Sequence, residues 1–433
     1  MIRRPPIVLA LAMAVAALGP PVAVGAVGPW SDPVDVWTDP ALTATNPGVG
    51  YDTSGRGLFS WALTGNPANR AFLTALRSVA PDGTLEQQRF STDTVLGRPA
   101  FYAAQRVAVL KRRSRAGASK ELSVQFASTR DAALGVTRKI DKVGPGDAAI
   151  AGNRLGLIAV LYSEPRSGSD VLWLALRRPK HSFQAPVTIR RGPSFGRLAV
   201  SVGDGGKIVV AYQRGSRIEV RVRRPAAAID PPEDIGSAAG LQSVQAAVSQ
   251  NGNAVVAWQR AQGLGQSQEV VTVRAAMLFA GTRLFRRADV LATPRGGPGS
   301  DAPIHAVIDA HGRATEAWSA ADAGVFTDRT TLAGAWRPPV QASAAGVLGD
   351  LALDEDGATL AVWRRSGAIE ASFISRFGEV GSPELVAQDA AAGAPVAAFD
   401  PRRAAPTVAW LHADPSGTGA SLRASTGAGL DGG

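Results

Sequence analysis

The sequence predicts an all-β protein, a single β-propeller of eight four-stranded blades. Three observations predict this fold. A string that closes on a large apolar residue recurs about every 50 residues, and Gly-containing turns join short runs with alternating apolar residues. Outside the first 26 residues, no long run has the three- and four-residue apolar spacing of an amphipathic helix.

The clearest copy of the string is QNGNAVVAWQR at 250–260, in which a turn dipeptide precedes an alternating run that ends on Trp258. Similar strings end on Trp61, Tyr212, Trp318 and Trp363, and weaker copies are placed at Leu110, Leu161 and Trp410. We expect these anchor residues to pack between neighbouring blades. Self-similarity at this period is typical of propellers, because each unit is one small sheet that buries its faces against its neighbours.

Each unit contains four candidate strands. Asn251-Gly252 supplies the positive φ that a tight hairpin between the first two strands requires. A third run follows each anchor, as at 269–278, and a fourth often carries proline, as at 335–343. Proline is tolerated at a sheet edge, and the outermost strand of a blade is such an edge. Four short strands per repeat predict one propeller blade.

The two ends of the chain predict how the ring closes. The eighth unit, 396–426, has its first three strands but no outer one, and residues 30–36 match the outer-strand pattern. We therefore expect the N-terminal strand to complete the last blade, which removes the open sheet edges that invite aggregation. An alternative division of the repeat gives seven blades and an irregular unit.

Residues 1–26 predict an export signal. Two arginines precede an apolar run over 7–18, which is too short to span a bilayer. We expect cleavage after about Ala26, a propeller domain over 27–426 and a disordered tail over 427–433. The alternative is that the segment is retained as a membrane anchor. The expected location is secreted or associated with the cell envelope, with no membrane segment after cleavage.

The composition limits the kinds of partner and site that the protein can have. The 433 residues carry a formal net charge of +10, and nearly all of the base is arginine, so the field favours anionic partners. The chain has no cysteine, which excludes disulfides, thiol catalysis, thiolate zinc sites and iron–sulfur clusters. An exported protein without disulfides must be stabilised by buried area, and this favours a large packed fold.

The repeat resembles the β-propeller units of secreted, mostly uncharacterised proteins of high-GC bacteria, whose motif is close to A-x-D-x-x-G-x-A-x-x-A-W. The resemblance covers residues 30–426 and implies the fold rather than an activity. A weaker similarity is to the Asp-box repeats of sialidase-like propellers. In this chain Asp354, Gly357 and Trp363 have different spacing and no serine opens the box, so sialidase chemistry is not implied.

No motif predicts catalysis or metal binding. Asp354 to Gly357 could begin a calcium loop, but no later acid supplies the bidentate ligand. The four histidines are too scattered for a local metal motif, and the serines at 166–170 lie in a flexible connector. Acids such as Asp52, Asp204 and Asp309 recur at turn positions, which indicates a structural role. We predict no metal, no cofactor and no catalytic residue, and favour a non-enzymatic protein.

The two faces of the expected ring differ in charge. If the first strand of each unit lies innermost, connectors between second and third strands and between blades emerge on one face, the loop face. The first hairpins emerge on the other, the hairpin face. Arginine-rich loops, including the enlarged segments 261–268 and 293–300, fall on the loop face, whereas acids such as Glu355 fall on the hairpin face. The candidate ligand-binding residues, chosen because loops on rigid scaffolds carry binding sites, are Arg70, Arg112, Arg113, Arg115, Arg166, Arg295, Arg364 and Arg365.

These features predict a secreted, non-enzymatic binding or scaffold propeller that recognises an anionic polymer or protein through the basic loop face. The expected partner is an anionic polysaccharide or a protein of the cell envelope. Nucleic acid is disfavoured by the expected location and by the few aromatic side chains available for base stacking. We expect a monomer. Two alternatives remain: a glycosidase or polysaccharide lyase with carboxylates and arginines at the channel mouth, and a purely structural or assembly protein.

Overall fold

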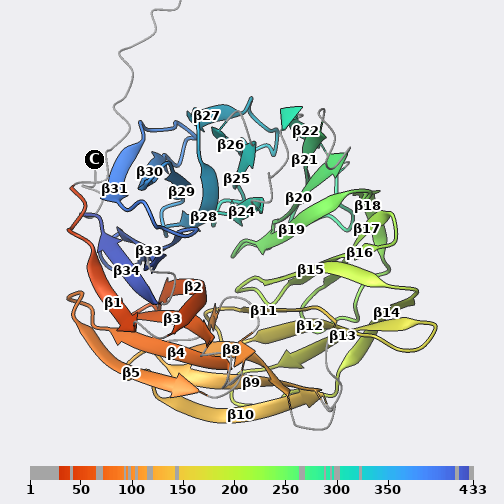
Figure 1. Ribbon diagram of the computed structural model, residues 1–433. Helices are drawn as coiled ribbons and strands as arrows, with labels where there is room; N and C mark the ends of the chain where they lie inside the picture. The colour runs from red at the N-terminus through yellow and green to blue at the C-terminus, as the bar shows by residue number, and fades with distance from the viewer. Residues whose placement is uncertain are drawn as a thin grey trace, which may run out of the picture.

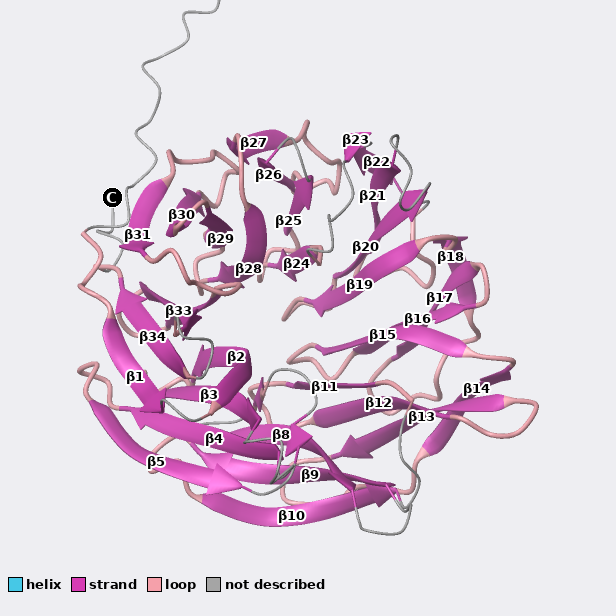
Figure 2. Ribbon diagram, viewed as in Figure 1, coloured by secondary structure: helices cyan, strands magenta, loops and turns pink. Residues whose placement is uncertain are grey.

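The recurring string folds as the first hairpin of a blade, and eight such units close into a ring. The computed structural model describes residues 29–39, 42–64, 72–91, 94–95, 99–102, 106–114, 120–141, 146–262, 269–286, 289–292, 295–296, 303–320, 324–414 and 419–428. Within these residues every regular element is a β-strand, and eight antiparallel sheets surround a common axis (Figures 1 and 2). The all-β fold with eight blades is confirmed, and the alternative of seven blades is wrong.

Blades 1 to 4 follow the chain, and within each of them the strands run in chain order from the axis outwards. Blade 1 contains β2 (Thr43–Tyr51), β3 (Gly57–Thr64), β4 (Phe72–Val79) and β5 (Leu85–Ser91). Blade 2 contains β6 (Thr94–Val95) and β7 (Ala100–Phe101), which share the innermost position, then β8 (Arg106–Ser114), β9 (Lys120–Ser128) and β10 (Leu134–Asp141). Blade 3 contains β11 (Ala148–Gly152), β12 (Ile158–Glu164), β13 (Asp170–Arg177) and β14 (Val187–Gly192). Blade 4 contains β15 (Phe195–Val202), β16 (Ile208–Arg214), β17 (Arg217–Arg223) and β18 (Glu233–Ser237).

Blades 5 to 8 repeat this order, and the last one borrows its outer strand from the N-terminus. Blade 5 contains β19 (Leu241–Val248), β20 (Ala254–Gln262), β21 (Glu269–Leu278) and an outer position divided between β22 (Asp289–Ala292) and β23 (Arg295–Gly296). Blade 6 contains β24 (His305–Ile308), β25 (Ala314–Ala320), β26 (Gly324–Arg329) and β27 (Val340–Ser343). Blade 7 contains β28 (Val347–Leu353), β29 (Thr359–Arg365), β30 (Ala368–Ile374) and β31 (Glu384–Gln388). Blade 8 contains β32 (Val396–Asp400), β33 (Ala405–Ala413), β34 (Ala420–Thr426) and β1 (Val34–Asp39).

The turn of the first hairpin has the chemistry that the sequence predicts. In blade 5, the Ser249 N–H donates to the Asn253 carbonyl at 2.9 Å, and the Gly252 N–H donates back to the Ser249 carbonyl at 3.0 Å. Gly252 has φ of 86°, a conformation that residues with a Cβ rarely adopt. The glycines at the matching positions of other blades have similar values, for example 76° at Gly55 and 90° at Gly357.

The recurring acids are part of these turns. Asp52 Oδ1 accepts a bond from the Ser54 N–H at 2.7 Å, and Asp309 Oδ1 accepts one from the His311 N–H at 2.9 Å. These carboxylates satisfy backbone donors that the turn leaves without a strand partner. The predicted structural role of the acids is therefore confirmed for these two positions.

Large buried side chains join each blade to the one before it. Trp258 packs on blade 4, Trp318 on blade 5 and Trp363 on blade 6, and all three are fully buried. The blade-packing role predicted for these anchors is confirmed. A Trp or Tyr at this position fills the space between two twisted sheets and contributes a large buried apolar area.

The anchor positions predicted for blades 2 and 3 were wrong by one residue. The structural equivalents of Trp258 are Lys111 rather than Leu110 and Tyr162 rather than Leu161, because one residue along a strand turns the side chain to the opposite face. Lys111 is fully buried, and its Nζ bonds to side chains in blades 1 and 2. A long side chain with a polar end thus replaces an aromatic ring there.

The N-terminal strand closes the ring as the ends of the sequence predict. In Figure 1, β1 lies beside β34, so the red and blue ends of the chain form one sheet. Val34 pairs with Ala424 and, after a bulge, Trp37 pairs with Leu422. Trp37 is 6% exposed, and its ring centroid lies 5.8 Å from that of Trp61 in blade 1. The strand covers 34–39 rather than 30–36, and Trp30 makes an isolated bridge to Gly427.

The described residues contain no helix that is long and apolar enough to cross a membrane. Residues 1–28 lie outside them, so the export signal and the domain limits at 26 and 426 stay predictions.

Two carboxyl groups lie directly opposite each other at the junction of blades 5 and 6. Glu316 in β25 and Asp328 in β26 are cross-strand partners, and both are buried. Ala314 and Trp318, which share the strand face of Glu316, pack against apolar side chains of blade 5. None of the four carboxyl oxygens has a hydrogen-bond partner in the described part of the chain. Burial raises the pKa of both groups well above the ordinary range, and the neighbouring Asp328 raises that of Glu316 further.

We predict that Trp37→Ala lowers the free energy of unfolding by about 3–5 kcal/mol, because it removes a large buried side chain from the closing strand. Val34→Ala is the matched control: Val34 lies on the same strand but is 51% exposed, and its loss should change stability by less than about 0.5 kcal/mol. Urea denaturation measures both. Equal and small effects would show that β1 does not hold the ring closed.

We also predict that Glu316→Gln stabilises the protein increasingly as pH rises. The pKa values of both acids are higher in the folded than in the unfolded protein. The unsubstituted protein therefore has its full free energy of unfolding below about pH 4 and loses part of it as pH rises through the folded-state pKa values of the two acids. The variant removes one of the two acids. Its free energy of unfolding relative to that of the unsubstituted protein should therefore grow as pH rises above about 5, as urea denaturation would measure.

Glu379→Gln, at an exposed turn position, is the control for that comparison and should show no such growth. A difference between Glu316→Gln and the unsubstituted protein that stays constant over the pH range would contradict the prediction.

Candidate functional site

The order of strands within each blade fixes which connections share a face. Because the sheets are antiparallel and begin at the axis, first-to-second and third-to-fourth turns lie on the hairpin face. Second-to-third turns and the connections between blades lie on the loop face. The assignment of connections to the two faces therefore agrees with the one predicted from the repeat.

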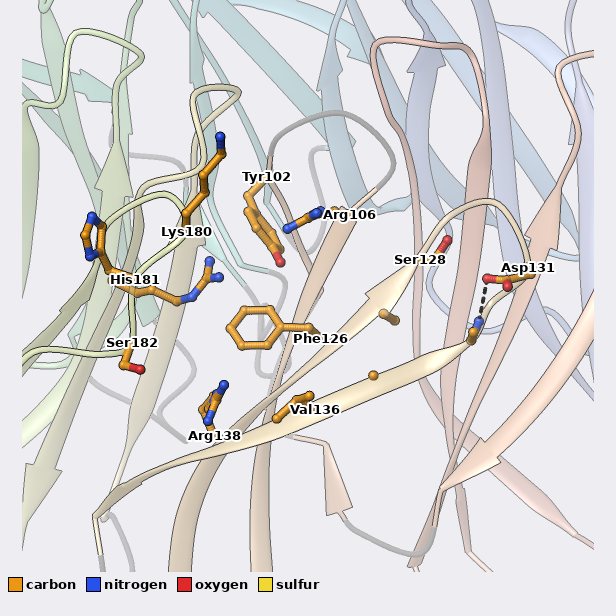
Figure 3. Close-up of a pocket in the computed structure, with 14 residues that line it drawn as sticks. Tyr102, Arg106, Phe126, Ser128, Asp131, Val136, Arg138, Lys180, His181 and Ser182 are labelled. Atoms are coloured by element: carbon orange, nitrogen blue, oxygen red, sulfur yellow. Dashed lines mark hydrogen bonds between the residues drawn. The ribbon is translucent and has the colours of Figure 1, made fainter.

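A large cleft opens on the hairpin face between blades 2 and 3 (Figure 3). It encloses about 660 Å³ and is lined by residues of β9, β10, the turn after β9 and the turn after β13. The corresponding cavity between blades 8 and 1 encloses only about 50 Å³. The repeat alone therefore does not produce this space. It arises where the sequences of blades 2 and 3 depart from their neighbours.

Basic side chains from both blades line this cleft. Its basic residues are Arg106, Arg138, Arg177, Lys180 and His181. One acid, Asp131, also lines it, and Asp131 Oδ1 accepts a bond from the Ala133 N–H at 3.1 Å. Across the described ranges, none of the five basic residues makes an ion pair. The cleft therefore presents cationic groups whose charge no neighbouring carboxylate neutralises.

Two aromatic rings form the middle of the cleft. The Arg177 Cζ lies 4.4 Å from the centroid of the Phe126 ring and 5.7 Å from that of Tyr102. A guanidinium over a ring is held by attraction to the π face, and its N–H groups stay available at the edge. Burial raises the pKa of Tyr102, although Arg177 and Arg106 oppose the rise. The phenol is thus a neutral hydrogen-bonding group at ordinary pH.

The arrangement suits an anion. Figure 3 shows Tyr102 and Phe126 between Lys180 and His181 on one side and Ser128 and Asp131 on the other, with Arg138 below. Hydrogen bonds from charged donors to carboxylate, sulfate or phosphate oxygens are about twice as strong as neutral ones. Phe126 is only partly exposed and one side of its ring is taken by Arg177, which leaves little surface for stacking a nucleobase.

The cleft was not predicted from the sequence. Its basic residues come from three strands and one turn spread over residues 106–181, and only the fold brings them together. One local signal was present: the run Arg177-Arg178-Pro179-Lys180-His181 places four basic residues in a single turn. The predicted separation of charge between the faces is incomplete, because this basic cleft lies on the hairpin face.

The candidate residues predicted on the loop face that the structure describes belong to blades 2, 3, 5 and 7. Arg70 and Arg115 lie outside the described residues. Arg112 and Arg113 belong to β8 and Arg295 to β23, in blades 2 and 5. The binding roles of these five residues stay predictions.

The remaining candidates make bonds within the protein. Arg166 Nη2 lies 2.9 Å from Glu164 Oε2, and Arg365 Nη1 lies 3.6 Å from Glu370 Oε1. Arg364 donates to the Ala392 carbonyl at 3.0 Å. Their binding role also stays a prediction, and the structure brings none of them into the cleft.

Carboxylates on the loop face form the ion pairs that hold such arginines within the protein. Glu370 accepts a bond from the Trp363 indole N–H at 2.9 Å and also pairs with Arg365. In blade 4, Glu219 accepts a bond from the Tyr212 hydroxyl at 2.9 Å and pairs with Arg214 at 2.7 Å. Each carboxylate thus satisfies the polar end of a buried anchor and pairs with an arginine.

At the axis of the hairpin face, Arg154 connects the first hairpins of three blades. Its Nε lies 2.8 Å from Asp204 Oδ2 in blade 4, and its Nη1 lies 3.4 Å from Glu355 Oε1 in blade 7. Blades 3 and 7 lie on opposite sides of the ring (Figure 1), so this second ion pair crosses the mouth of the central channel. The enzymatic alternative requires carboxylates and an arginine gathered at this mouth.

Within the described ranges, no group of three or more His, Asp or Glu side chains could hold a metal ion.

No protein-family model and no curated protein matches this chain. Solved structures with a similar fold include a protein of unknown function from Dyadobacter fermentans DSM 18053, with TM-score 0.44 and 11% identity over 93% of this chain and 99% of that one. The fucose-specific lectin from Aleuria aurantia has TM-score 0.41 and 13% identity over 70% and 94%. The polysaccharide lyase Uly1 has TM-score 0.45 and 10% identity over 77% and 89%. The likeness concerns the fold alone, and the resemblance to propellers of high-GC bacteria stays a prediction.

Proposed function

We propose that this protein is a secreted, non-enzymatic binding propeller that recognises an anionic polymer through the cleft between blades 2 and 3. One observation carries the proposal: five basic side chains line a cleft of about 660 Å³, and within the described residues none of them has an acidic partner. Side chains that only keep a surface soluble need not gather around one concave space, whereas ligand sites are concave and polar at a few positions.

A polymer suits this cleft better than a single small anion. The basic residues come from different strands and both blades, so a chain with repeated charges meets several of them at once. Four of the five, Arg106, Arg138, Lys180 and His181, are exposed and can adjust to a flexible ligand. The net charge of +10 favours the approach of any polyanion. The expected export points to an acidic polysaccharide of the cell envelope as the natural ligand.

The affinity should be electrostatic and therefore sensitive to salt. Each exposed charge pair contributes about 0.2–1 kcal/mol, so contacts at five basic residues give at most about 5 kcal/mol, which corresponds to a dissociation constant of tenths of a millimolar or weaker. At 0.1 M ionic strength, the interaction between exposed charges that are more than about 10 Å apart is largely screened by salt. Binding of polygalacturonate, a polymer of uronic acids, should accordingly weaken as salt is raised, whereas the neutral polymer dextran should not bind.

We predict that the double variant Arg138→Ser/Lys180→Ser binds polygalacturonate about tenfold more weakly than the unsubstituted protein, because two exposed charge contacts are lost. Titration calorimetry at low salt measures the dissociation constant. The matched control is Arg283→Ser/Arg376→Ser, which removes the same charge from the hairpin face of blades 5 and 7 and should change binding less than twofold.

A second comparison decides between the two faces. Arg364→Ser/Arg365→Ser removes the same charge from the loop face. If this variant loses affinity while the cleft variant keeps it, the loop-face site is right and the cleft proposal is wrong. Equal losses in all three double variants would mean that only the net charge matters.

We predict that Lys180→Gly stabilises the protein while it weakens polyanion binding. Lys180 has φ of 64°, and Ala226, at the same turn position in blade 4, has φ of 56°. Glycine adopts this conformation without the Cβ clash, so either substitution should raise the free energy of unfolding by about 0.5–1 kcal/mol. Only Lys180→Gly should also weaken binding. Thermal unfolding and the polygalacturonate titration measure the two effects, and equal affinity in the two variants would contradict a role for Lys180.

A second candidate function, glycosidase or polysaccharide lyase, is favoured by the cluster of Arg154, Asp204 and Glu355 at the channel mouth. An arginine can neutralise a uronate while a carboxylate takes up or donates a proton. Both carboxylates already pair with the same guanidinium, so a substrate must displace one of them. Release of unsaturated or reducing-end products during the polygalacturonate titrations would support this candidate.

A further inference from the structure

Three consecutive blades carry exposed apolar side chains at one edge of the hairpin face. Leu284, Leu332 and Phe377 lie in the turns between the third and fourth strands of blades 5, 6 and 7, which are neighbours in the ring (Figure 1). They are 68%, 69% and 55% exposed. The same turns of blades 1 to 4 lie within the described residues and carry no exposed large apolar side chain. We call Leu284, Leu332 and Phe377 the apolar rim.

The three turns that carry the apolar rim pack against one another. The ring of Phe279 in the blade 5 turn lies so close to Gly334 in the blade 6 turn that a Cβ at residue 334 would be 2.2 Å from its Cζ. A Cβ at Gly378, in the blade 7 turn, would be 3.4 Å from Nη1 of Arg337 in blade 6. These contacts hold the turns in place relative to one another, so the apolar rim is presented as one surface.

Arginines surround the apolar rim. Four exposed arginines lie in the same three turns: Arg283, Arg286, Arg337 and Arg376. The Cζ of Arg286 is 4.4 Å from the centroid of the Phe279 ring, and that of Arg376 is 4.9 Å from the centroid of Phe377. None of the four makes an ion pair with a described residue, and Glu379 is the one acid in the segments 279–288, 330–339 and 375–383. The surface therefore combines protruding apolar side chains with positive charge.

This combination fits the surface of an anionic lipid bilayer. Binding at a bilayer interface grows with the apolar area buried among the headgroups and with the attraction of cations to anionic lipids. Each arginine near such a surface strengthens binding about fivefold. Apolar side chains at the tips of turns protrude and can enter the headgroup region without a partner surface shaped to receive them. A protein partner would have to supply such a surface, with acids placed opposite the arginines.

We propose that the apolar rim binds the surface of an anionic lipid bilayer. Leu284, Leu332 and Phe377 enter the headgroup region, and the neighbouring arginines pair with lipid phosphates. This site lies across the ring from the basic cleft of blades 2 and 3 (Figure 1) and shares no residue with it. The proposal therefore does not depend on polyanion binding by the cleft.

The first test measures sedimentation of the protein with vesicles of equal parts phosphatidylglycerol and phosphatidylcholine. Residues 1–26 are removed from every protein tested, because their apolar run would itself favour a bilayer and the whole ring lies between residues 29 and 428. Leu332→Ser/Phe377→Ser keeps the net charge and should bind at least about tenfold more weakly, because apolar area is no longer buried in the interface.

The matched control is Phe90→Ser/Leu385→Ser. It removes the same two kinds of side chain, each 51% exposed, from the outer strands of blades 1 and 7, and should change binding less than twofold. Thermal unfolding confirms that both double variants are folded. Arg283→Ser/Arg376→Ser should also weaken binding at least about tenfold, because two arginines near the lipid surface are lost.

The second test locates the contact. The chain has no cysteine, so Leu332→Cys provides a single thiol for an environment-sensitive fluorescent label. The emission of this label should shift to shorter wavelength when the mixed vesicles are added, because the label leaves water. The same label at Leu385→Cys should not shift.

Three outcomes would overturn the proposal. The first is equal binding of the mixed vesicles by Leu332→Ser/Phe377→Ser and the unsubstituted protein, which would leave only the attraction of net charge. The second is equal binding of the mixed vesicles and of vesicles of phosphatidylcholine alone, which would leave no role for the arginines. The third is absence of vesicle binding together with a dimer that Leu332→Ser/Phe377→Ser abolishes in sedimentation velocity, which would assign the apolar rim to a second copy of the chain. Polygalacturonate binding by this variant should be unchanged, so the two proposals fail separately.

Discussion

The ring depends on the packing of one large buried side chain from each blade against the preceding blade. A four-stranded sheet of about 45 residues cannot bury both faces by itself, so each blade is stable only when its neighbours are present. The buried tryptophans, such as Trp258 and Trp410, fill the gaps between twisted sheets. The indole N–H of Trp410 donates to Asp389 at 2.7 Å, whereas the buried indole N–H of Trp258 has no hydrogen-bond partner among the described residues.

This packing governs where charge is available for binding. On the loop face, the carboxylates of Glu219 and Glu370 accept hydrogen bonds from buried anchors and form ion pairs with neighbouring arginines. Those arginines are therefore engaged in contacts within the protein. In blade 2 the anchor is Lys111, and the next junction, between blades 2 and 3, opens into the cleft. Among the described residues, basic side chains line a cleft without acidic partners where the repeat departs from its own pattern.

The sequence was sufficient for the fold because the period, the turn glycines and the two ends of the chain are local features. The register within blades 2 and 3 could not be read in the same way. Strands buried on both faces lose the alternation that identifies the outward side, so Leu161 and Tyr162 are equally plausible as the anchor until the neighbouring blades are in place. The cleft could not be predicted for a related reason. Arg106 belongs to blade 2 and Lys180 to blade 3, and they line the same cleft only when the two blades are packed together. The arginines that are conspicuous in the sequence pair with acids close by in the chain, as Arg166 does with Glu164 and Arg365 with Glu370, and the sequence does not show which of these neighbours are in contact.

The pairing of β1 with β34 also determines the order of events in folding. Val34 in β1 pairs with Ala424 in β34, so neither strand has its full set of hydrogen bonds until the two ends of the chain come together. Contacts this distant in sequence form slowly, because the entropy of closing the loop is lost before the contact is gained. Until then, the edge of β34 and the face of Trp37 are exposed, and the incomplete blade is the part of the chain most open to proteases and to pairing with another molecule.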